Sequence, residues 1–175
     1  MAQKAMQKRY YFADVHVHGY YPNHILKYWE RKGIEVDVTE ADQADLLAGK
    51  VDYIGFSYYM SFAIDAHRKD NPHYDYLETE DLVKNPYVEA SDWDWQIDPE
   101  GLRYSLNWFT DMYHLPLFIV ENGFGAIDQV EEDGMVHDDY RIDYLRKHIK
   151  AMDKTVEHGV DLRAYTTWGC IDCVS

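Results

Sequence analysis

Three short apolar runs, separated by two longer amphipathic stretches, constrain the fold of this chain more than any other feature. The runs VDYIGFSYY, LPLFIV and VDLRAYTTW (residues 51–59, 115–120 and 160–168) have the length and the β-branched and aromatic content of buried strands. Apolar side chains within residues 102–113 and 142–156 recur at helical spacing. Strands that alternate with helices in this way predict an α/β protein built on a parallel sheet.

The first fifty residues predict two helices with recognisable ends. One helical pattern begins after Pro22 and stops at Gly33, a residue type that commonly ends helices. A second begins after Thr39, which has Asp42 in the capping-box position three residues later, and stops at Gly49.

Composition narrows the class of protein. Hydrophobic residues make up 46% of the 175, so the chain can bury a core and is not disordered. The formal net charge of −15 argues against nucleic acids and anionic membrane surfaces as partners. The apolar runs fall far short of the ~20 residues that span a bilayer. No signal peptide is recognisable and only two cysteines occur, which together predict a cytoplasmic protein.

The sequence shows no internal repeat and no linker rich in glycine, serine or proline. We therefore expect residues 1–175 to form a single compact unit. Within it, residues 68–98 are polar and interrupted by prolines, which predicts a long loop. Long loops inside compact enzymes often carry function.

The strongest local motif is FIVENGFG, residues 118–125, in which an apolar strand ends on a carboxylate. Glu121 is followed at once by Asn122 and Gly123. In parallel α/β folds, active sites form where polar groups follow the carboxyl ends of strands. This pattern makes Glu121 a candidate catalytic group, although a helix-capping or loop role explains the pattern alone equally well.

VENG resembles the nucleophile motif of glycoside hydrolase family 1, in which the glutamate attacks the anomeric carbon of a sugar. Five further segments, in chain order, resemble that family's barrel from the approach to its sixth strand to the end of its eighth: FADVHVHGYYPNH, VDYIGFSYY, WQIDPEGLR, DDYRIDYLRKHI and YTTWGCIDCVS. The resemblance implies a partial TIM (β/α)8 barrel comprising roughly strands 6 to 8 with their helices. Three such units are too few to close an eight-stranded barrel of ~250 residues.

The resemblance also implies roles for four residues. Glu121 is expected to be the nucleophile, and Tyr59 to hydrogen-bond it and hold its charge and orientation. Trp168 is expected to form an aromatic platform under the sugar ring. Ser57 stands where most family members carry asparagine, a departure that recurs in members acting on 6-phosphorylated sugars. For Tyr59 and Trp168, ordinary core packing is the alternative.

The substrate class rests on Ser175, which stands where members that cleave unphosphorylated glucosides carry a glutamate. A carboxylate would repel a phosphate, whereas a hydroxyl can donate a hydrogen bond to it. The resemblance therefore implies retaining hydrolysis of a phosphorylated β-glucoside, a 6-phospho-β-glucoside, in the complete enzyme and without a cofactor.

A retaining glycosidase needs a second carboxylate ~5 Å from the nucleophile to protonate the leaving group. The family's acid/base glutamate lies in an Asn-Glu motif on its fourth strand, and no such strand precedes Phe12. We therefore expect that roughly the first five βα units are missing and that the chain alone is inactive. An incomplete barrel exposes apolar edges, so self-association or pairing with the missing part is also expected. A non-catalytic, self-associating half-barrel is thus the main alternative function.

Two other motifs suggest rival chemistry. Asp14, His16 and His18 would share one side of a strand, as in metal-dependent amidohydrolases, but that fold needs further ligands on later strands. Cys170 and Cys173 form a Cys-x-x-Cys pair, which suggests redox activity or half of a zinc site. The sequence has no second pair to complete zinc ligation, so we predict no metal site.

Overall fold

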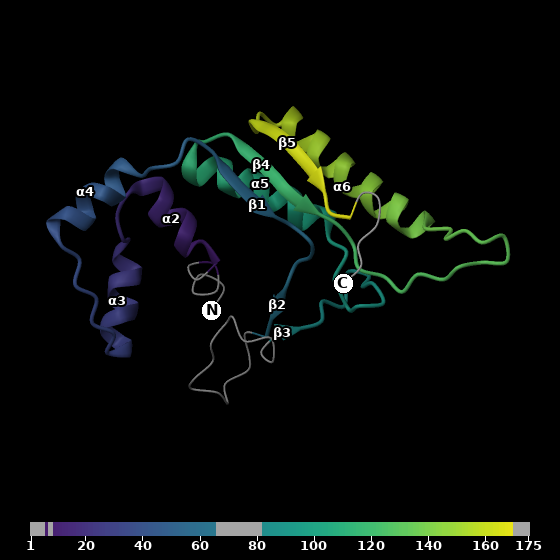
Figure 1. Cartoon of the computed structure of the whole chain (residues 1–175), viewed down its shortest axis with the longest axis horizontal. Helices are drawn as coiled ribbons and strands as arrows, with labels where there is room; N and C mark the ends of the chain where they lie inside the picture. The colour runs from purple at the N-terminus through teal and green to yellow at the C-terminus, as the bar shows by residue number, and fades with distance from the viewer. Residues whose placement is uncertain (1–5, 7–8, 66–81, 170–175) are drawn as a thin grey trace. The chain divides into compact units, whose positions relative to one another are not determined.

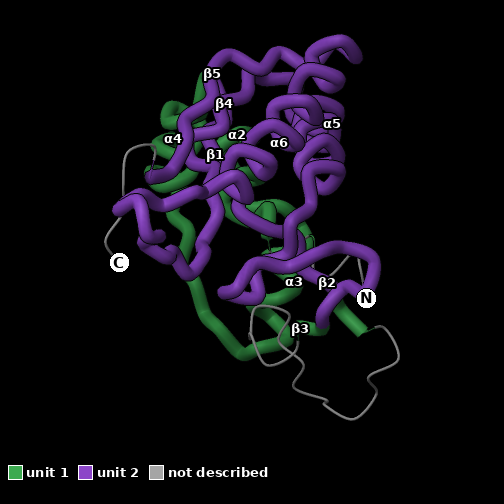
Figure 2. The backbone as a smooth tube through the Cα atoms, turned by 90° about the vertical axis from the view of Figure 1, so that its right-hand side faces the viewer, with its two compact units in different colours: residues 1–52, 64–83 green, residues 53–63, 84–175 purple. Residues whose placement is uncertain are grey.

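The computed structural model describes residue 6 and residues 9–65 and 82–169. Contacts between Cα atoms divide the chain into two compact units, which Figure 2 shows in green and purple. Unit 1 comprises Met1–Asp52 and Ile64–Val83, and unit 2 comprises Tyr53–Ala63 and Lys84–Ser175. From the sequence we expected residues 1–175 to form a single compact unit.

Unit 2 is built on a three-stranded parallel sheet with the strand order β1-β4-β5 (Figure 1). The strands are β1 (Ile54–Ser57), β4 (Leu117–Asn122) and β5 (Leu162–Thr167). Each falls largely within or just beyond one of the three apolar runs, so the predicted α/β class with a parallel sheet is confirmed. β4 lies in the middle and forms hydrogen bonds with both neighbours.

Two helices lie side by side on one face of this sheet, α5 (Pro99–Tyr113) and α6 (Asp139–Glu157) (Figures 1 and 2). The carboxylate of Asp98 accepts a hydrogen bond from the Gly101 N–H at 2.8 Å and so caps the start of α5. The predicted stripe of α5 is buried: Leu102, Leu106, Phe109 and Tyr113. Leu117 and Ile119 of β4 are fully buried and complete the core of unit 2.

The apolar stripe that predicted α6 consists of Ile142, Leu145, Ile149, Met152 and Val156, and of these only Met152 is buried. Ile142, Ile149 and Val156 of that stripe are about half exposed. The buried residues of α6 are Tyr144, His148, Ala151, Met152 and Thr155. On this face the Tyr144 hydroxyl, the Nδ1 atom of His148 and the Thr155 hydroxyl have hydrogen-bond partners inside the unit. The side chains of Ile142, Ile149 and Val156 therefore leave apolar surface exposed on α6. The self-association expected from the sequence stays a prediction.

Unit 1 contains the two helices predicted near its start, and their ends are confirmed. The helices of this unit are α2 (Tyr11–His18), α3 (Asn23–Lys32) and α4 (Glu40–Ala48). Gly33 follows α3 in the left-handed conformation, and Thr39 with Asp42 forms a complete capping box at α4. A further pair of short strands is β2 (Ala63–Ile64) and β3 (Leu82–Val83), of which Ala63 is counted with unit 2 and the other three residues with unit 1. None of the helices that the structure describes is long and apolar enough to cross a membrane.

The metal-binding interpretation of DVHVHG assumed a strand, and this was wrong. The segment lies in helix α2, where residues two apart point to opposite sides, so His16 and His18 do not share a face. α2 packs against α4, and Gly19 ends it with φ 73° at a close approach to that helix. A Cβ on Gly19 would lie 2.9 Å from the Cα of Leu47. This tertiary contact outweighs the strand-like alternation of the sequence.

Leu106→Ala is expected to lower the free energy of unfolding by about 2–5 kcal/mol, because a fully buried side chain is replaced by a cavity. Met112→Ala on the same helix truncates a side chain that is 48% exposed and should change stability by less than about 0.5 kcal/mol. Urea unfolding followed by circular dichroism measures both variants. Equal losses would show that α5 does not bury the face described here.

Candidate active site

The candidate site forms where the carboxyl ends of the three parallel strands of unit 2 meet. Glu121 lies at the end of β4, Ser57 ends β1, and Trp168 follows directly after β5. Tyr59 lies two residues beyond β1. The sheet therefore brings together four of the five residues that the sequence analysis selected, from positions up to 111 residues apart. Ser175, the fifth, lies outside the described residues.

An irregularity in the β1–β4 pairing aims these side chains at one another. Phe56 pairs with Ile119, but Ser57 pairs with Glu121, so Val120 is skipped. Such a bulge re-aims side chains at the end of a strand. Here it sets Ser57 opposite Glu121.

The Glu121 carboxylate accepts two hydrogen bonds on the same oxygen. The Tyr59 hydroxyl donates to Oε2 at 2.8 Å, and the Ser57 hydroxyl donates to Oε2 at 2.9 Å. These bonds, with that of Tyr59 the larger contribution, lower the pKa of Glu121 below its usual range. The carboxylate is solvent-exposed and therefore carries its charge at neutral pH.

An aromatic cluster surrounds the Tyr59 ring. The ring centroid of Tyr59 lies 5.6 Å from that of Trp168 and 5.4 Å from that of Trp95, both in edge-on geometry. Trp95 also packs beside Trp168 and against Trp93. Such rings offer flat apolar faces of the kind on which sugar rings stack.

Trp93 and Trp95 were not among the site residues selected from the sequence: both fall in the predicted long loop of residues 68–98, and Trp95 was noted only as the first residue of WQIDPEGLR. Their signal was the alternation in the segment DWDWQ just before α5. Ala90 and Gln96 form an antiparallel bridge across this segment, and an alternation of only four residues inside a predicted loop is too short to mark a site.

Two glycines of the FIVENGFG motif allow the rings to approach the backbone. A Cβ on Gly123 would lie 2.9 Å from the Trp168 ring, and a Cβ on Gly125 would lie 2.1 Å from the Trp93 ring. Both distances are too short for a real side chain, so glycine is required for this packing. The motif therefore supplies the carboxylate and also the space for the aromatic groups beside it.

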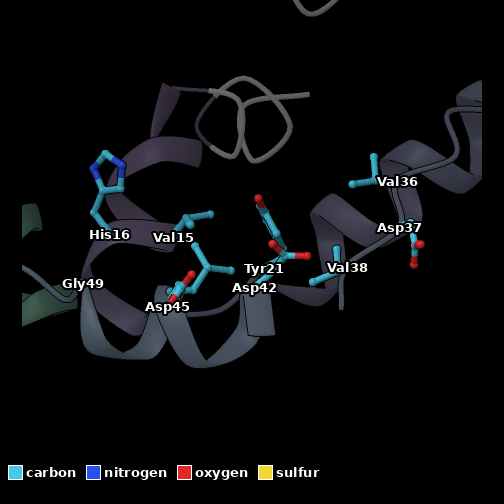
Figure 3. A pocket seen from close by; sticks show the side chains of 10 residues that line it. Val15, His16, Tyr21, Val36, Asp37, Val38, Asp42, Asp45 and Gly49 are labelled. Carbon is cyan, nitrogen blue, oxygen red and sulfur yellow. The ribbon is translucent and has the colours of Figure 1, made fainter. Parts of the chain in front are cut away.

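A hollow of about 460 Å³ lies in unit 1, and none of these site residues lines it. Its lining includes His16 of α2 and the carboxylates of Asp42 and Asp45 of α4, and the His16 ring points away from those carboxylates (Figure 3). Asp42 is already engaged in its capping box. Among the described residues, no group of three or more His, Cys, Asp or Glu side chains could hold a metal ion. Cys170 and Cys173 lie outside the described residues.

The family model of glycosyl hydrolase family 1 matches residues 1–175. The chain belongs to glycosyl hydrolase family 1. Among its relatives in this family, it is 52% identical over 178 residues to the aryl-phospho-beta-D-glucosidase BglA of Bacillus subtilis, covering 100% of this chain and 37% of that protein. It is 46% identical over 167 residues to a 6-phospho-beta-glucosidase of Dickeya chrysanthemi, covering 94% of this chain and 35% of that protein.

A solved structure of this family matches the chain over most of its length. The family 1 β-glucosidase of Thermotoga maritima superposes with a TM-score of 0.77 at 28% sequence identity. The match covers 94% of this chain and 36% of that structure. This family 1 chain thus spans little more than a third of the length of the relatives that it matches.

Tyr59→Phe is expected to raise the pKa of Glu121, because it removes the larger of the two hydrogen bonds that stabilise the carboxylate. Ser57→Ala should raise it as well, by less. As the pH falls, Glu121 in either variant then takes up its proton at a higher pH than in the unchanged chain. A ¹³C NMR titration of the side-chain carboxyl resonance measures this.

The exposed Tyr104 on α5 provides the control, since Tyr104→Phe should leave the Glu121 titration unchanged. At pH values above the pKa that Glu121 has in the unfolded chain, the two hydrogen bonds also stabilise the fold. This stabilisation is lost as the pH falls through the lower pKa of the folded state. An unaltered Glu121 pKa in Tyr59→Phe would contradict the described contact.

Proposed function

We propose that this chain supplies the nucleophile and part of the sugar site of a retaining 6-phospho-β-glucosidase. The observation that carries the proposal is an ionised Glu121 at the end of β4, held by Tyr59 and Ser57 beside the ring of Trp168. The printed names of two relatives, an aryl-phospho-beta-D-glucosidase and a 6-phospho-beta-glucosidase, support the substrate class.

In the proposed reaction, an oxygen of the Glu121 carboxylate attacks the anomeric carbon of the glucoside. The bond from that carbon to the leaving oxygen breaks, and a glycosyl-enzyme ester forms. Water then attacks the same carbon, the ester bond breaks, and the sugar is released with its configuration retained. A lowered pKa suits this role, because only the ionised carboxylate attacks.

The proton for the leaving oxygen must come from a second carboxylate ~5 Å from the first. The family motif that carries it, Asn-Glu, does not occur in residues 1–175. We therefore assign the acid/base group to a part of the enzyme that is not in this sequence, and infer that the 175-residue chain alone lacks useful activity.

The preference for a phosphorylated sugar is assigned to Ser175, with Ser57 as a further departure from the family's common pattern. A hydroxyl at position 175 can donate to a phosphate oxygen, whereas a glutamate there would add a repelling charge. A few local donors suffice for this, so the net charge of −15 does not oppose binding. A cytoplasmic location and the absence of a cofactor stay predictions.

In an enzyme that contains this sequence, Glu121→Ala is expected to lower kcat by at least about 10³-fold, because the attacking group is removed. Release of the phenol from an aryl 6-phospho-β-glucoside measures the rate. Glu131→Ala, which truncates an exposed loop glutamate, is the matched control and should retain activity.

The assignment of the acid/base group is tested with the 175-residue chain by itself. Turnover of the same substrate by this chain, abolished by Glu121→Ala, would show that residues 1–175 hold a complete catalytic pair and would overturn that assignment.

Ser175→Glu is expected to lower kcat/KM for the phosphorylated aryl glucoside by roughly tenfold or more, relative to the unphosphorylated one, because like charges repel. Ser175→Ala removes only the hydroxyl and should cost less. The ratio of kcat/KM values for the two substrates is the measurement. An unaltered ratio in Ser175→Glu would remove Ser175 from the phosphate site.

A further inference from the structure

The loop that carries Tyr59 is not held by the strand ladder. The final backbone hydrogen bond between β1 and β4 runs from the Tyr58 N–H to the Glu121 carbonyl, at 2.9 Å. Tyr59 comes after it, yet its hydroxyl is the main stabiliser of the Glu121 carboxylate. Some other contact must keep this residue in place.

Two buried side chains take over where the ladder ends. Asn122 is fully buried and donates through Nδ2 to the Tyr58 carbonyl at 2.6 Å. Tyr144 of α6 is 2% exposed, and its hydroxyl donates to the Tyr59 carbonyl at 3.0 Å. Two consecutive carbonyls before and after the Tyr59 Cα are thus each held by a side chain.

The two side chains also hold each other. Asn122 Nδ2 donates to the Tyr144 hydroxyl at 2.9 Å, and the Tyr165 hydroxyl donates to Asn122 Oδ1 at 2.9 Å. The Tyr144 hydroxyl therefore accepts one hydrogen bond and donates another. Burial raises the pKa of Tyr144 far above its usual value and that of Tyr165 to about 12, so both stay neutral donors.

The Tyr144 ring is fixed by packing as well. The His148 ring lies on it with centroids 3.9 Å apart, and Phe124 lies on it at 5.1 Å. His148 Nδ1 donates to the Tyr144 carbonyl at 2.8 Å. Helix α6 thereby fixes the hydroxyl of Tyr144 at one point beneath the Tyr59 backbone.

From this arrangement we propose that Tyr144, together with Asn122, is a positioning residue for Glu121. It holds the backbone of Tyr59 so that the Tyr59 hydroxyl stays in hydrogen-bond distance of Glu121 Oε2. The effect on catalysis rests on the proposed function, whereas the effect on the Glu121 carboxylate does not.

Tyr144→Phe keeps the ring and removes only the hydroxyl. The expected result is an upward shift of the Glu121 pKa that is smaller than in Tyr59→Phe, because the donor remains but is less well held. In an enzyme containing this sequence, kcat for an aryl 6-phospho-β-glucoside should fall by roughly ten- to a hundredfold. ¹³C NMR titration of the Glu121 carboxyl group and steady-state kinetics are the two measurements.

Tyr140→Phe is the matched control. It removes a hydroxyl from the same helix, and that hydroxyl donates to Asp128 rather than to the hydrogen-bond network around Asn122. A merely structural role for Tyr144 would lower the melting temperature and leave the Glu121 pKa unchanged. If Tyr144→Phe does not fold, Tyr165→Phe replaces it in the test. This variant removes the hydroxyl that donates to Asn122 Oδ1, and it should also raise the pKa of Glu121.

The outcomes separate the two proposals. A folded Tyr144→Phe or Tyr165→Phe variant with an unshifted Glu121 pKa overturns the positioning role, whatever the activity. A shifted pKa in a protein that does not cleave phosphorylated glucosides supports the positioning role and contradicts only the proposed function.

Discussion

The parallel pairing of β4 with β1 on one side and β5 on the other is the constraint on which the site depends. The backbone hydrogen bonds of this central strand align three strand ends, and each of them carries a group of the site. Helices α5 and α6 cover one face of the sheet and leave these ends open. The bulge after Phe56 then adjusts the alignment, so that Ser57 faces Glu121.

A neutral hydrogen-bonded layer lies beneath the charged carboxylate. Burial raises the pKa of Tyr144 and Tyr165 and lowers that of His148, so all three side chains are uncharged near neutral pH. Asn122 links this layer to the backbone next to Glu121. The charge of the site thus lies at the surface, and the buried groups act on the backbone of Tyr58 and Tyr59 rather than on the carboxylate itself.

Much of this architecture could be predicted from local patterns. Apolar runs located the three strands of the parallel sheet but not β2 and β3, and Gly33, Thr39 and Gly49 located helix ends, because caps and buried strands depend on neighbouring residues. Glu121 was recognisable because a carboxylate at the end of an apolar strand is an unusual local feature.

The rest depended on tertiary contacts that no local pattern contains. The segment DVHVHG alternates like a strand, yet its packing against α4 makes it helical. On α6, the Tyr144 hydroxyl bonds to the Tyr59 carbonyl beyond β1, and Tyr144 and His148 are buried while the more apolar Ile142, Ile149 and Val156 stay exposed. Asn122 was visible only as the neighbour of Glu121, since its partners lie as far as 64 residues away in the sequence.

The order of the three strands also sets the distance between the side chains at their ends. Neighbouring strands in a sheet lie about 4.8 Å apart, so the backbones of β1 and β5 lie about 10 Å apart, and the side chains of Tyr59 and Trp168 reach across this gap until their ring centroids are 5.6 Å apart. One further strand between β4 and β5 would move Trp168 about another 4.8 Å away and break its contact with Tyr59, so the strand order itself keeps the indole ring beside the residue that hydrogen-bonds Glu121.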